Sequence, residues 1–403
     1  MSQKTKIQWC DSTVNPTMGC SGCELFPTPA RVIEEINAAV SALFAKSECA
    51  GTGSCEPNTV CGAALAIDSR TMVKELINDA YLKIKNLEIG HRNAVTTTNI
   101  WHFREKLSSV ISDKYGRDAG RVALAAIMKS LTCYAAKLHL NRGANIDRPD
   151  REIKKGYAPT FEQVTNYEGR MAAAECWKDL LGSVNPLTPW KDKLPRMVFI
   201  SDMGDALSSK SQRQFDFLKR EVIDSVNSVK GRKHLWLWLT KRPLYLRDFA
   251  QQVFGLPSNV CAMTTLTGLD TLYRVDELRQ VRAECRGLSV EPLWERIPPE
   301  KLDLQGIDWL IVGGESGSGE LTKPFHLEWA EELRDHCRKH GVAFFLKQLG
   351  RNPMMGGKPI RLRDPHGGDW DEWPSRLRVR EFPGHFHRYR ADERKPSAVT
   401  RPA

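Results

Sequence analysis

The segment HLWLWLT, residues 234–240, decides the fold of this chain. It is apolar, carries hardly any charge and is too short for an ordinary helix, which is typical of a strand buried on both faces of a sheet. Its two tryptophans, Trp236 and Trp238, hold alternate positions, so we expect them in the core, with stacking on nucleic-acid bases as the alternative. A strand of this kind implies neighbouring strands and covering helices.

Similar apolar runs recur between residues 196 and 350, and amphipathic stretches such as 211–229 and 326–341 separate them. A repeated order of strand, helix and strand predicts parallel β/α units. With KIQWCDS (6–12) as a first strand, the runs favour an α/β fold, a partial or complete parallel β/α barrel, over a Rossmann sheet. The other runs are RMVFISD (196–202), VCAMTTL (260–266), GLSVEPL (287–293), DWLIVGGES (308–316) and AFFLKQLG (343–350).

Polar residues follow these runs. In a β/α barrel the residues just past each strand converge on one face, so we expect a polar mouth there. The glycine-rich segment GGESGSG (313–319) lies at this mouth and matches neither common nucleotide-binding fingerprint, G-x-G-x-x-G or G-x-x-x-x-G-K-[ST]. The residues expected at the mouth are Asp202, Asp205, Thr240, Lys241, Arg242, Thr264, Thr265, Glu291, Glu315, Ser316, Lys347 and Gln348.

The composition bounds the class of protein. With 403 residues, 41% hydrophobic and 27% charged, the chain can build an ordinary globular core. No run approaches the ~20 apolar residues of a membrane helix, and the first residues lack the apolar stretch of a signal peptide. We therefore expect a cytoplasmic protein with no membrane partner. Its eleven cysteines are then free thiols or metal ligands rather than disulfides.

The C-terminal end is basic. Residues 376–403 carry eight basic side chains against three acidic ones, interleaved with Phe382, Phe386 and Tyr389. Arginines mixed with aromatic rings suit a phosphate backbone with bases to stack on, so nucleic acid is an expected partner. The alternative is a solvated basic tail without a ligand. His385 and His387 are assigned no metal.

The domain organisation is predicted to be discontinuous. The stretch 27–130 breaks the β/α rhythm and reads as several helices, so it is expected to be a helical insertion. The chain after residue 350 is rich in Gly, Pro, Arg and Trp and is expected to be irregular, with a disordered basic tail. The predicted domains are 1–26 plus 131–350 as the barrel, 27–130 as the helical insertion and 351–403 as the C-terminal extension.

The segment NPTMGCSGCELF (15–26) holds Cys20 and Cys23 in a Cys-x2-Cys pair, which is half of a metal site. If the insertion is bridged, Cys133 in LTCYAAKLH becomes the third thiol. From spacing alone, an iron–sulfur cluster, a structural zinc site and unrelated free thiols stay open. Cys10 is expected to be a buried core thiol. Within the insertion, Cys49, Cys55 and Cys61 could hold a second metal or cluster.

These motifs, in this order, give the chain a resemblance to a known family. It resembles the phage-associated, radical-SAM-like three-cysteine-motif family of unknown function. The matching stretches are KIQWCDSTVNPTMGC, CYAAKLH, SDMGDAL, WLTKRP, LSVEPL, DWLIVGGESG and FFLKQLG. One departure is that 109 residues lie between Cys23 and Cys133, whereas the family's cysteines lie close together in sequence. An insertion of this length is tolerable because the entropy of loop closure grows slowly with length.

The resemblance implies a radical-SAM-type barrel and a [4Fe-4S] cluster held by Cys20, Cys23 and Cys133. Three thiolates leave one iron open for S-adenosylmethionine, and an electron donor supplies the electron that cleaves the cofactor to a radical. By the same resemblance, Ser201, Asp202 and Met203 would lie near the methionine amine. Cofactor contacts are likewise implied for Gly313, Gly314 and Glu315, and substrate or sulfonium contacts for Lys241 and Glu291.

The expected function is therefore a radical enzyme that modifies or repairs nucleic acid or a nucleotide. One alternative is a radical enzyme acting on a peptide or small metabolite. Another, from a different class, is a non-catalytic nucleic-acid-binding protein in which zinc is bound by the cysteines and stabilises the fold.

Overall fold

The computed structural model describes residues 2–20, 22–23, 25, 38–39, 112–113, 116–130, 133–139, 156–158, 161, 164–317 and 322–389. The chain forms two compact units, unit 1 (Met1–Thr17 with Asn166–Ala403) and unit 2 (Met18–Thr165). Unit 1 is therefore interrupted once. Its two ends at the interruption lie together, since Thr17 Oγ1 donates a hydrogen bond to Asn166 Oδ1 at 3.0 Å.

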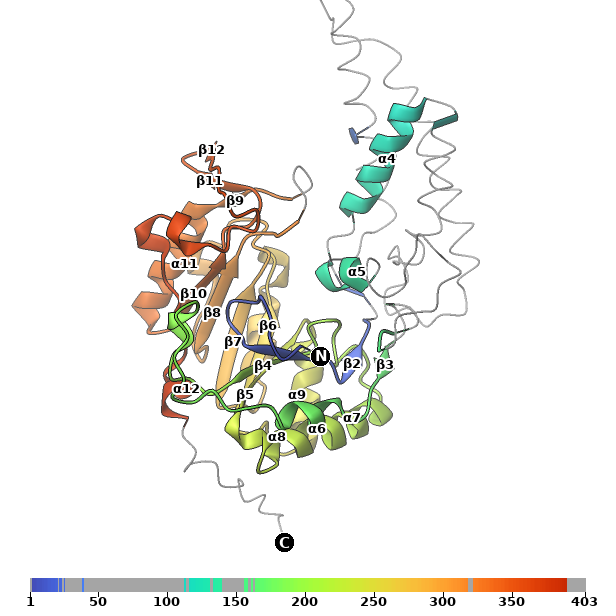
Figure 1. The fold of residues 1–403 in the computed structure, drawn as a ribbon, viewed down its shortest axis with the longest axis vertical. Coiled ribbons are helices and arrows are strands. Elements are labelled where there is room, and N and C mark those ends of the chain that lie inside the picture. The colour runs from blue at the N-terminus through green and yellow to red at the C-terminus, as the bar shows by residue number, and fades with distance from the viewer. Residues whose placement is uncertain are drawn as a thin grey trace, which may run out of the picture. The chain divides into compact units, whose positions relative to one another are not determined.

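Unit 1 is built on a parallel sheet of seven strands that curls into a half-barrel (Figure 1). The strands stand in the sheet in the same order as in the chain, whereas a Rossmann sheet reverses its order at a switch point. The predicted parallel β/α architecture is therefore confirmed at the level of a half-barrel. The strands are β1 (Ser12–Val14), β4 (Met197–Ile200), β5 (Leu235–Thr240), β6 (Val260–Thr265), β7 (Cys285–Val290), β8 (Trp309–Gly313) and β10 (Ala343–Gln348).

The predicted first strand is wrong in its position. Strand β1 begins at Ser12, so Trp9 and Cys10 precede it, in a turn where the Cys10 N–H donates to Ile7 O at 3.5 Å. Asp11 makes the first contact with the sheet, because its carboxylate accepts the Met197 N–H at 2.9 Å. The expectation for Cys10 itself is confirmed, since it is fully buried, and burial raises the pKa of its thiol.

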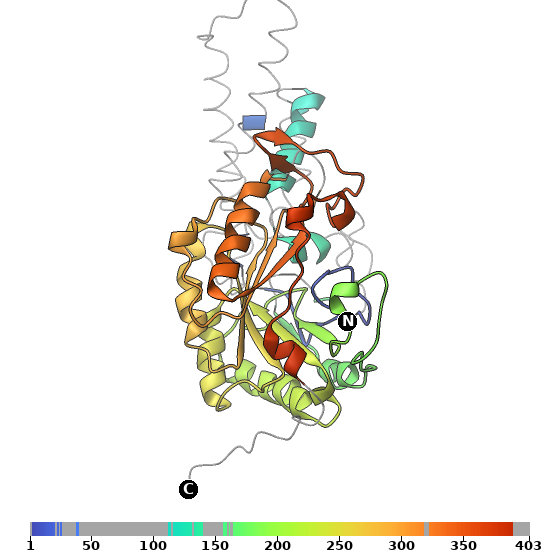
Figure 2. The ribbon, with the colours of Figure 1, turned by 90° about the vertical axis from the view of Figure 1, so that its left-hand side faces the viewer.

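Helices cover the outer face of this sheet (Figure 2). Helix α7 begins where Ser211 Oγ accepts the Gln214 N–H, and α11 ends at Gly341 in the left-handed conformation, as its glycine stop predicts. The predicted single helix 211–229 is divided by a π-helical turn, Lys219–Ile223. The helices are α6 (Arg170–Glu175), α7 (Gln212–Leu218), α8 (Asp224–Asn227), α9 (Pro243–Gln252), α10 (Tyr273–Arg279), α11 (Leu327–His340) and α12 (Gly384–Arg388).

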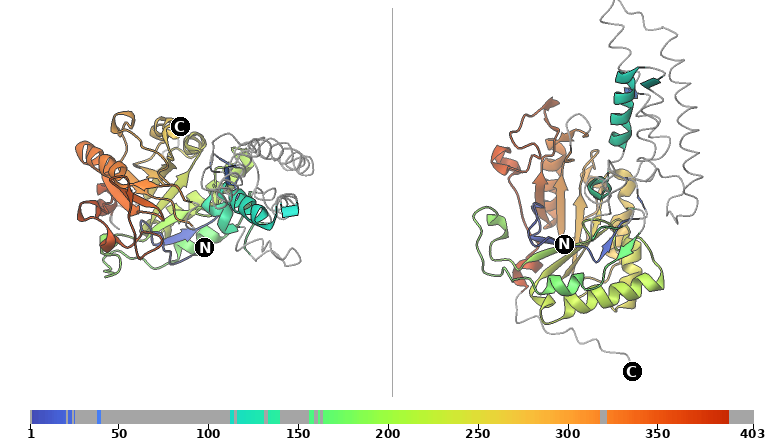
Figure 3. Two further views of the ribbon diagram at one scale, coloured as in Figure 1. Left: turned by 90° about the horizontal axis from the view of Figure 1, so that it is seen from above. Right: turned by 45° about the vertical axis from the view of Figure 1, so that its right-hand side comes forward.

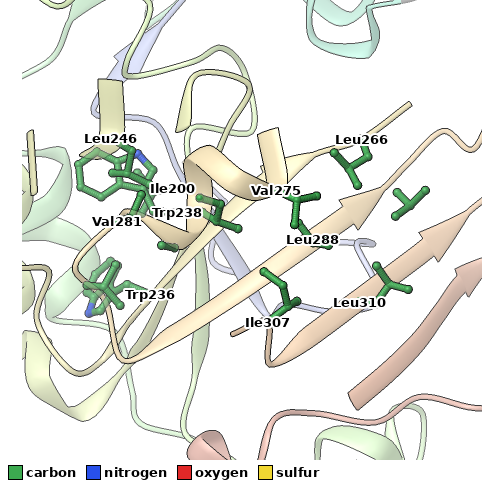
Figure 4. Close-up of a cluster of buried hydrophobic side chains, with 14 of the residues drawn as sticks. Ile200, Trp236, Trp238, Leu246, Leu266, Val275, Val281, Leu288, Ile307 and Leu310 are labelled. Carbon is green, nitrogen blue, oxygen red and sulfur yellow. The ribbon is translucent and has the colours of Figure 1, made fainter. Parts of the chain in front are cut away.

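The larger core lies between sheet and helices. Alternate strand residues point outward and pack on helix residues such as Leu246 of α9 and Val275 of α10 (Figure 4). Trp236 and Trp238 belong to this core and are 0% exposed, so the prediction that they are core residues is confirmed. Neither ring is available for stacking on a base.

A second core lies on the inner face of the sheet, towards the N-terminal ends of the strands. Strand residues such as Phe199, Trp309 and Phe345 pack there against Trp9 and the C-terminal segment. The buried C-terminal rings are Phe382, Phe386 and Tyr389. Helix α12 is fixed at the N-terminal ends of the strands, because His385 Nε2 hydrogen-bonds Ser258 O at 2.7 Å and the Tyr389 hydroxyl donates to Arg232 O at 3.0 Å.

The expected role of the C-terminal aromatic residues is therefore wrong. Phe382, Phe386 and Tyr389 are 6%, 1% and 5% exposed, so they pack in the protein and cannot stack on bases. Arg380 is also occupied. Its guanidinium lies 4.0 Å from the centre of the Trp190 ring and donates to Leu346 O and Lys347 O, and burial lowers its pKa to about 10.

Short elements complete unit 1 beyond the half-barrel (Figure 3). A three-stranded sheet is formed by β9 (Phe325–His326), β11 (Pro353–Met355) and β12 (Lys358–Pro359). Two 3-10 turns, Trp370–Glu372 and Ser375–Leu377, lead to α12. The segment predicted to be irregular is thus folded onto unit 1 as far as Tyr389.

Unit 2 contains helices α4 (Arg117–Ser130) and α5 (Tyr134–His139). Helix α4 confirms the last of the predicted helices of the insertion. The strands β2 (Thr17–Met18) and β3 (Thr165–Asn166) form a two-stranded sheet. Cys49, Cys55 and Cys61 lie outside the described residues. Across the described parts of the chain, no helix has the length and apolarity needed to cross a membrane.

His234, just before β5, predicts how stability depends on pH. It is 0% exposed, and burial lowers its pKa to about 4, with the Lys233 charge adding to the effect. The imidazole of an unfolded chain titrates near ~6.5. Between these values the unfolded state binds more protons, so the free energy of unfolding should fall by about 3 kcal/mol as the pH falls through this window. Above it, the contribution is complete.

Urea unfolding at a series of pH values from ~7.5 to ~4.5 checks this. His234→Phe should flatten the slope, whereas the exposed His366→Phe should leave it as in the unmodified protein. An equal slope in all three proteins would assign the acid sensitivity to other groups.

Candidate functional site

The alternation of side chains along the strands places a polar layer on the inner face. The buried inner series Met197 and Phe199 of β4 continues to Ser201, and Cys261 and Met263 of β6 continue to Thr265. The same period of two holds for β5, β7 and β10. We call this set the inner polar layer: Ser201, Lys241, Thr265, Ser289, Glu291 and Lys347.

Glu291, directly after β7, is the centre of the layer. Its Oε2 accepts hydrogen bonds from the Trp9 indole N–H and the Ser289 hydroxyl, both at 3.3 Å. Lys347 Nζ lies 3.1 Å from Oε1, and the two side chains are 22% and 12% exposed for Lys347 and Glu291. Oε1 therefore has an ionic contact with Lys347 and no other partner within the described residues.

Trp9 lies between Glu291 and the aromatic core of the inner face. Its ring packs on Phe199 and Trp309, with ring centres 4.8 and 6.3 Å apart, while its N–H reaches up to Glu291. Trp9 thereby separates the inner polar layer from the aromatic core below it. The sequence analysis missed this role because Trp9 was assigned to a strand.

Several residues predicted for the mouth instead fix the strand ends. Asp205 is 5% exposed and accepts hydrogen bonds from the Thr240 hydroxyl, the Leu207 and Lys241 N–H groups and Arg242 Nη1, at 2.8 to 3.1 Å. This network joins the loop after β4 to the end of β5. Thr264 and Gln348 likewise bond the main chains of neighbouring strand ends.

The two glycines after β8 are explained by packing within unit 1. A Cβ atom on Gly313 would lie 2.5 Å from Glu291 Oε1, and one on Gly314 would lie 2.3 Å from Leu349 O. The neighbouring Glu315 accepts the Trp294 indole N–H and the Lys323 N–H, both at 3.3 Å. Contact of these three residues with a cofactor stays a prediction.

The loop after β4 is held by Asn15, a second residue that the sequence analysis did not single out. Asn15 Nδ2 donates to Asp202 Oδ1 at 2.6 Å, and Asn15 Oδ1 accepts the Met203 N–H at 2.9 Å. Loss of solvation raises the pKa of the Asp202 carboxyl, although the hydrogen bond from Asn15 opposes the shift. Ser201 has a left-handed backbone, φ 68°, and its buried hydroxyl has no hydrogen-bond partner among the described residues.

The three predicted cluster ligands all belong to unit 2. Cys20 and Cys133 are buried, and Cys23 is half-buried. The Cys20 N–H donates to Phe161 O at 2.8 Å, and the Phe161 ring lies 5.7 Å from the ring of His139 at the end of α5. Helix α5 starts directly after Cys133 and rises by about 9 Å to His139.

A metal site is not assembled in the described parts of the chain. Within them, no three His, Cys, Asp or Glu side chains come together as a group that could hold a metal ion. The other described cysteines are outside the predicted set. Cys176 is exposed, and Cys261, Cys285 and Cys337 are buried, as expected for surface and core residues.

Comparison with known proteins gave one match, to a family model. Neither the curated proteins nor the solved structures contain a match to this chain. One family model matches residues 130–374, a range that runs from just before Cys133 through the whole inner polar layer. Because this range covers more than half of the chain, the protein belongs to the family described as "Protein of unknown function (DUF5131)".

Proposed function

We propose that the protein is an iron–sulfur, S-adenosylmethionine-dependent radical enzyme whose substrate, a nucleotide or nucleic acid, lies at the inner polar layer. The observation that carries the proposal is the layer of buried and part-buried polar side chains at the carboxyl ends of the half-barrel's parallel strands, where ligands bind in β/α barrels. In that layer Glu291 and Lys347 form a part-buried ion pair, and the Ser201 hydroxyl has no hydrogen-bond partner among the described residues.

The cysteines fit the cluster by their donor chemistry. Thiolates are the usual ligands of iron–sulfur clusters, and three of them leave one iron of a [4Fe-4S] cube open for another ligand. The burial of Cys20 and Cys133 would shield such a cluster from solvent and oxidants. When bound, the cluster supplies the electron that cleaves the sulfonium bond of S-adenosylmethionine, and a separate electron donor replaces that electron.

The protein's own residues would then bind the cofactor and the substrate and orient them. Asn15 fixes the Ser201–Asp202–Met203 element, which would bind the methionine part of the cofactor. Cys20 follows Asn15 by five residues in the chain. Glu291, charged beside Lys347, would accept a hydrogen bond from the substrate, and Trp9 below it keeps water out of the inner core.

The test is the metal content of protein purified without oxygen. We expect a brown protein with iron, sulfide and broad visible absorption. Cys133→Ala should lose the colour and most of the iron, while Cys176→Ala, at an exposed cysteine outside the set, should keep both. A colourless protein with stoichiometric zinc would overturn the proposal in favour of the zinc-stabilised nucleic-acid-binding protein. Full iron in Cys133→Ala would remove that residue from the ligand set.

A further inference from the structure

Lys241 carries a charge that the described part of the protein does not neutralise. Its side chain is half-buried, and its ammonium has one hydrogen bond there, to Thr265 Oγ1 at 3.5 Å. No described carboxylate lies within ion-pair distance of Nζ. Asp205, which accepts the N–H of Lys241, is already paired with Arg242 at 2.8 Å. A part-buried cation without a counter-ion favours binding of an anion.

The donors around this position can bind a phosphate. A planar carboxylate is matched by the fork of an arginine, whereas lysine binds phosphate as a point charge. Lys241 and the Thr265 hydroxyl stand on the adjacent strands β5 and β6 and approach each other to 3.5 Å. Two donors so close together can bind oxygens of one tetrahedral group.

A hydrogen-bond acceptor, Glu291, follows the next strand of the sheet. Glu291 follows β7, which pairs with β6, so its main chain lies two strand spacings from that of Lys241, about 10 Å. Its Oε1 is buried beside Lys347 Nζ and has no hydrogen bond from a described residue, so a donor that reached it would find an acceptor. The site therefore takes a molecule with an anion at one end and a hydroxyl or amino donor at the other, which is the arrangement of a nucleotide.

We propose that Lys241 and Thr265 bind a phosphate group of the substrate, a nucleotide unit whose hydroxyl or amino group donates to Glu291. This inference rests on the proposed function for the location of the substrate, and it adds the group by which the substrate is held. The phosphate comes either from a free nucleotide or from a nucleic-acid strand, which share this chemistry.

Binding measured by calorimetry on the full chain tests the site without any reaction. The ligands are the four nucleoside 5′-monophosphates, the matching nucleosides and a short single-stranded oligonucleotide. At least one monophosphate or the oligonucleotide should bind more tightly than the nucleoside. Lys241→Gln should weaken that binding at least about tenfold, as expected for a lost charged hydrogen bond, and should leave nucleoside binding unchanged.

Two further variants keep the test sharp. Thr265→Val should weaken the binding of phosphate-bearing ligands and leave nucleoside binding unchanged. The control is Lys219→Gln, at an exposed lysine of the π-helical turn, which should bind all ligands like the unmodified protein. Tighter binding of the oligonucleotide with the same Lys241 dependence identifies a nucleic-acid strand as the source, and tighter binding of a monophosphate identifies a free nucleotide.

The proposal is overturned if phosphate adds nothing to affinity or if Lys241→Gln binds as well as the unmodified protein. The visible absorption of the same samples separates the two proposals. A colourless protein with Lys241-dependent phosphate binding keeps this site and rejects the radical enzyme. A brown protein without Lys241-dependent phosphate binding supports the radical enzyme and rejects this phosphate site.

Discussion

Replacing Asp205 by alanine should lower the free energy of unfolding by about 3–5 kcal/mol, because the substitution breaks a buried, hydrogen-bonded ion pair. The Arg242 guanidinium, 15% exposed, would lose its contact with the Asp205 carboxylate, and the Thr240 hydroxyl would lose its acceptor. Two main-chain N–H groups, of Leu207 and Lys241, would lose theirs as well. Urea unfolding at neutral pH measures the loss.

Two control variants define the cause. Asp224→Ala, at an exposed acid on α8, should change stability by no more than about 0.5 kcal/mol. Asp205→Asn keeps an acceptor for Thr240 but turns an amide toward Arg242 and the Lys241 N–H, so it should also be strongly destabilised. A loss below about 1 kcal/mol in Asp205→Ala would mean that the pair behaves like an exposed salt bridge.

Asp205 also illustrates what the sequence could predict of the site. Apart from the first strand, the apolar runs located the strands of the large sheet to within a few residues, and the barrel rule collected the polar residues at their ends. That rule does not distinguish the two faces of the sheet. The period of two along each strand does, because it assigns Lys241, Thr265, Glu291 and Lys347 to the inner face. This pattern does not place Asp205 either, because Asp205 lies in the loop after β4, which is hydrogen-bonded to the end of β5.

Other contacts of the site could not be read from local sequence. The Trp9–Glu291 hydrogen bond joins residues 282 positions apart, and Asn15–Asp202 joins residues 187 apart. Each depends on which strands become neighbours, and no run or spacing encodes that. Its place after a predicted strand and the family resemblance therefore identified Glu291 as a candidate. Trp9, which bonds Glu291, and Asn15, which holds the Asp202 loop, appeared only in the fold.

The C-terminal segment was misjudged for a related reason. Its glycine, proline and arginine content is that of an irregular tail, and five residues of α12 are too few to show a helical period. Whether an aromatic ring among arginines meets a base or a core depends on the surface it reaches. Here the strands present Trp309 and Phe345 on the inner face, and burial of apolar area against them holds the segment in place.

Replacing Phe386 by alanine should therefore cost about 3–5 kcal/mol of unfolding free energy, as for other fully buried phenylalanines. Phe386 is 1% exposed, and its ring centre lies 5.6 Å from that of Trp309 and 6.2 Å from that of Phe382. Removing the ring leaves a cavity between the sheet and α12 that backbone contacts at both ends of the helix prevent from closing. Urea unfolding measures the loss, and Leu187→Ala, at a side chain 84% exposed, serves as the control with an expected change within about 0.5 kcal/mol. If Phe386→Ala were as stable as this control and instead bound nucleic acid more weakly, the ring would serve a ligand and not the core.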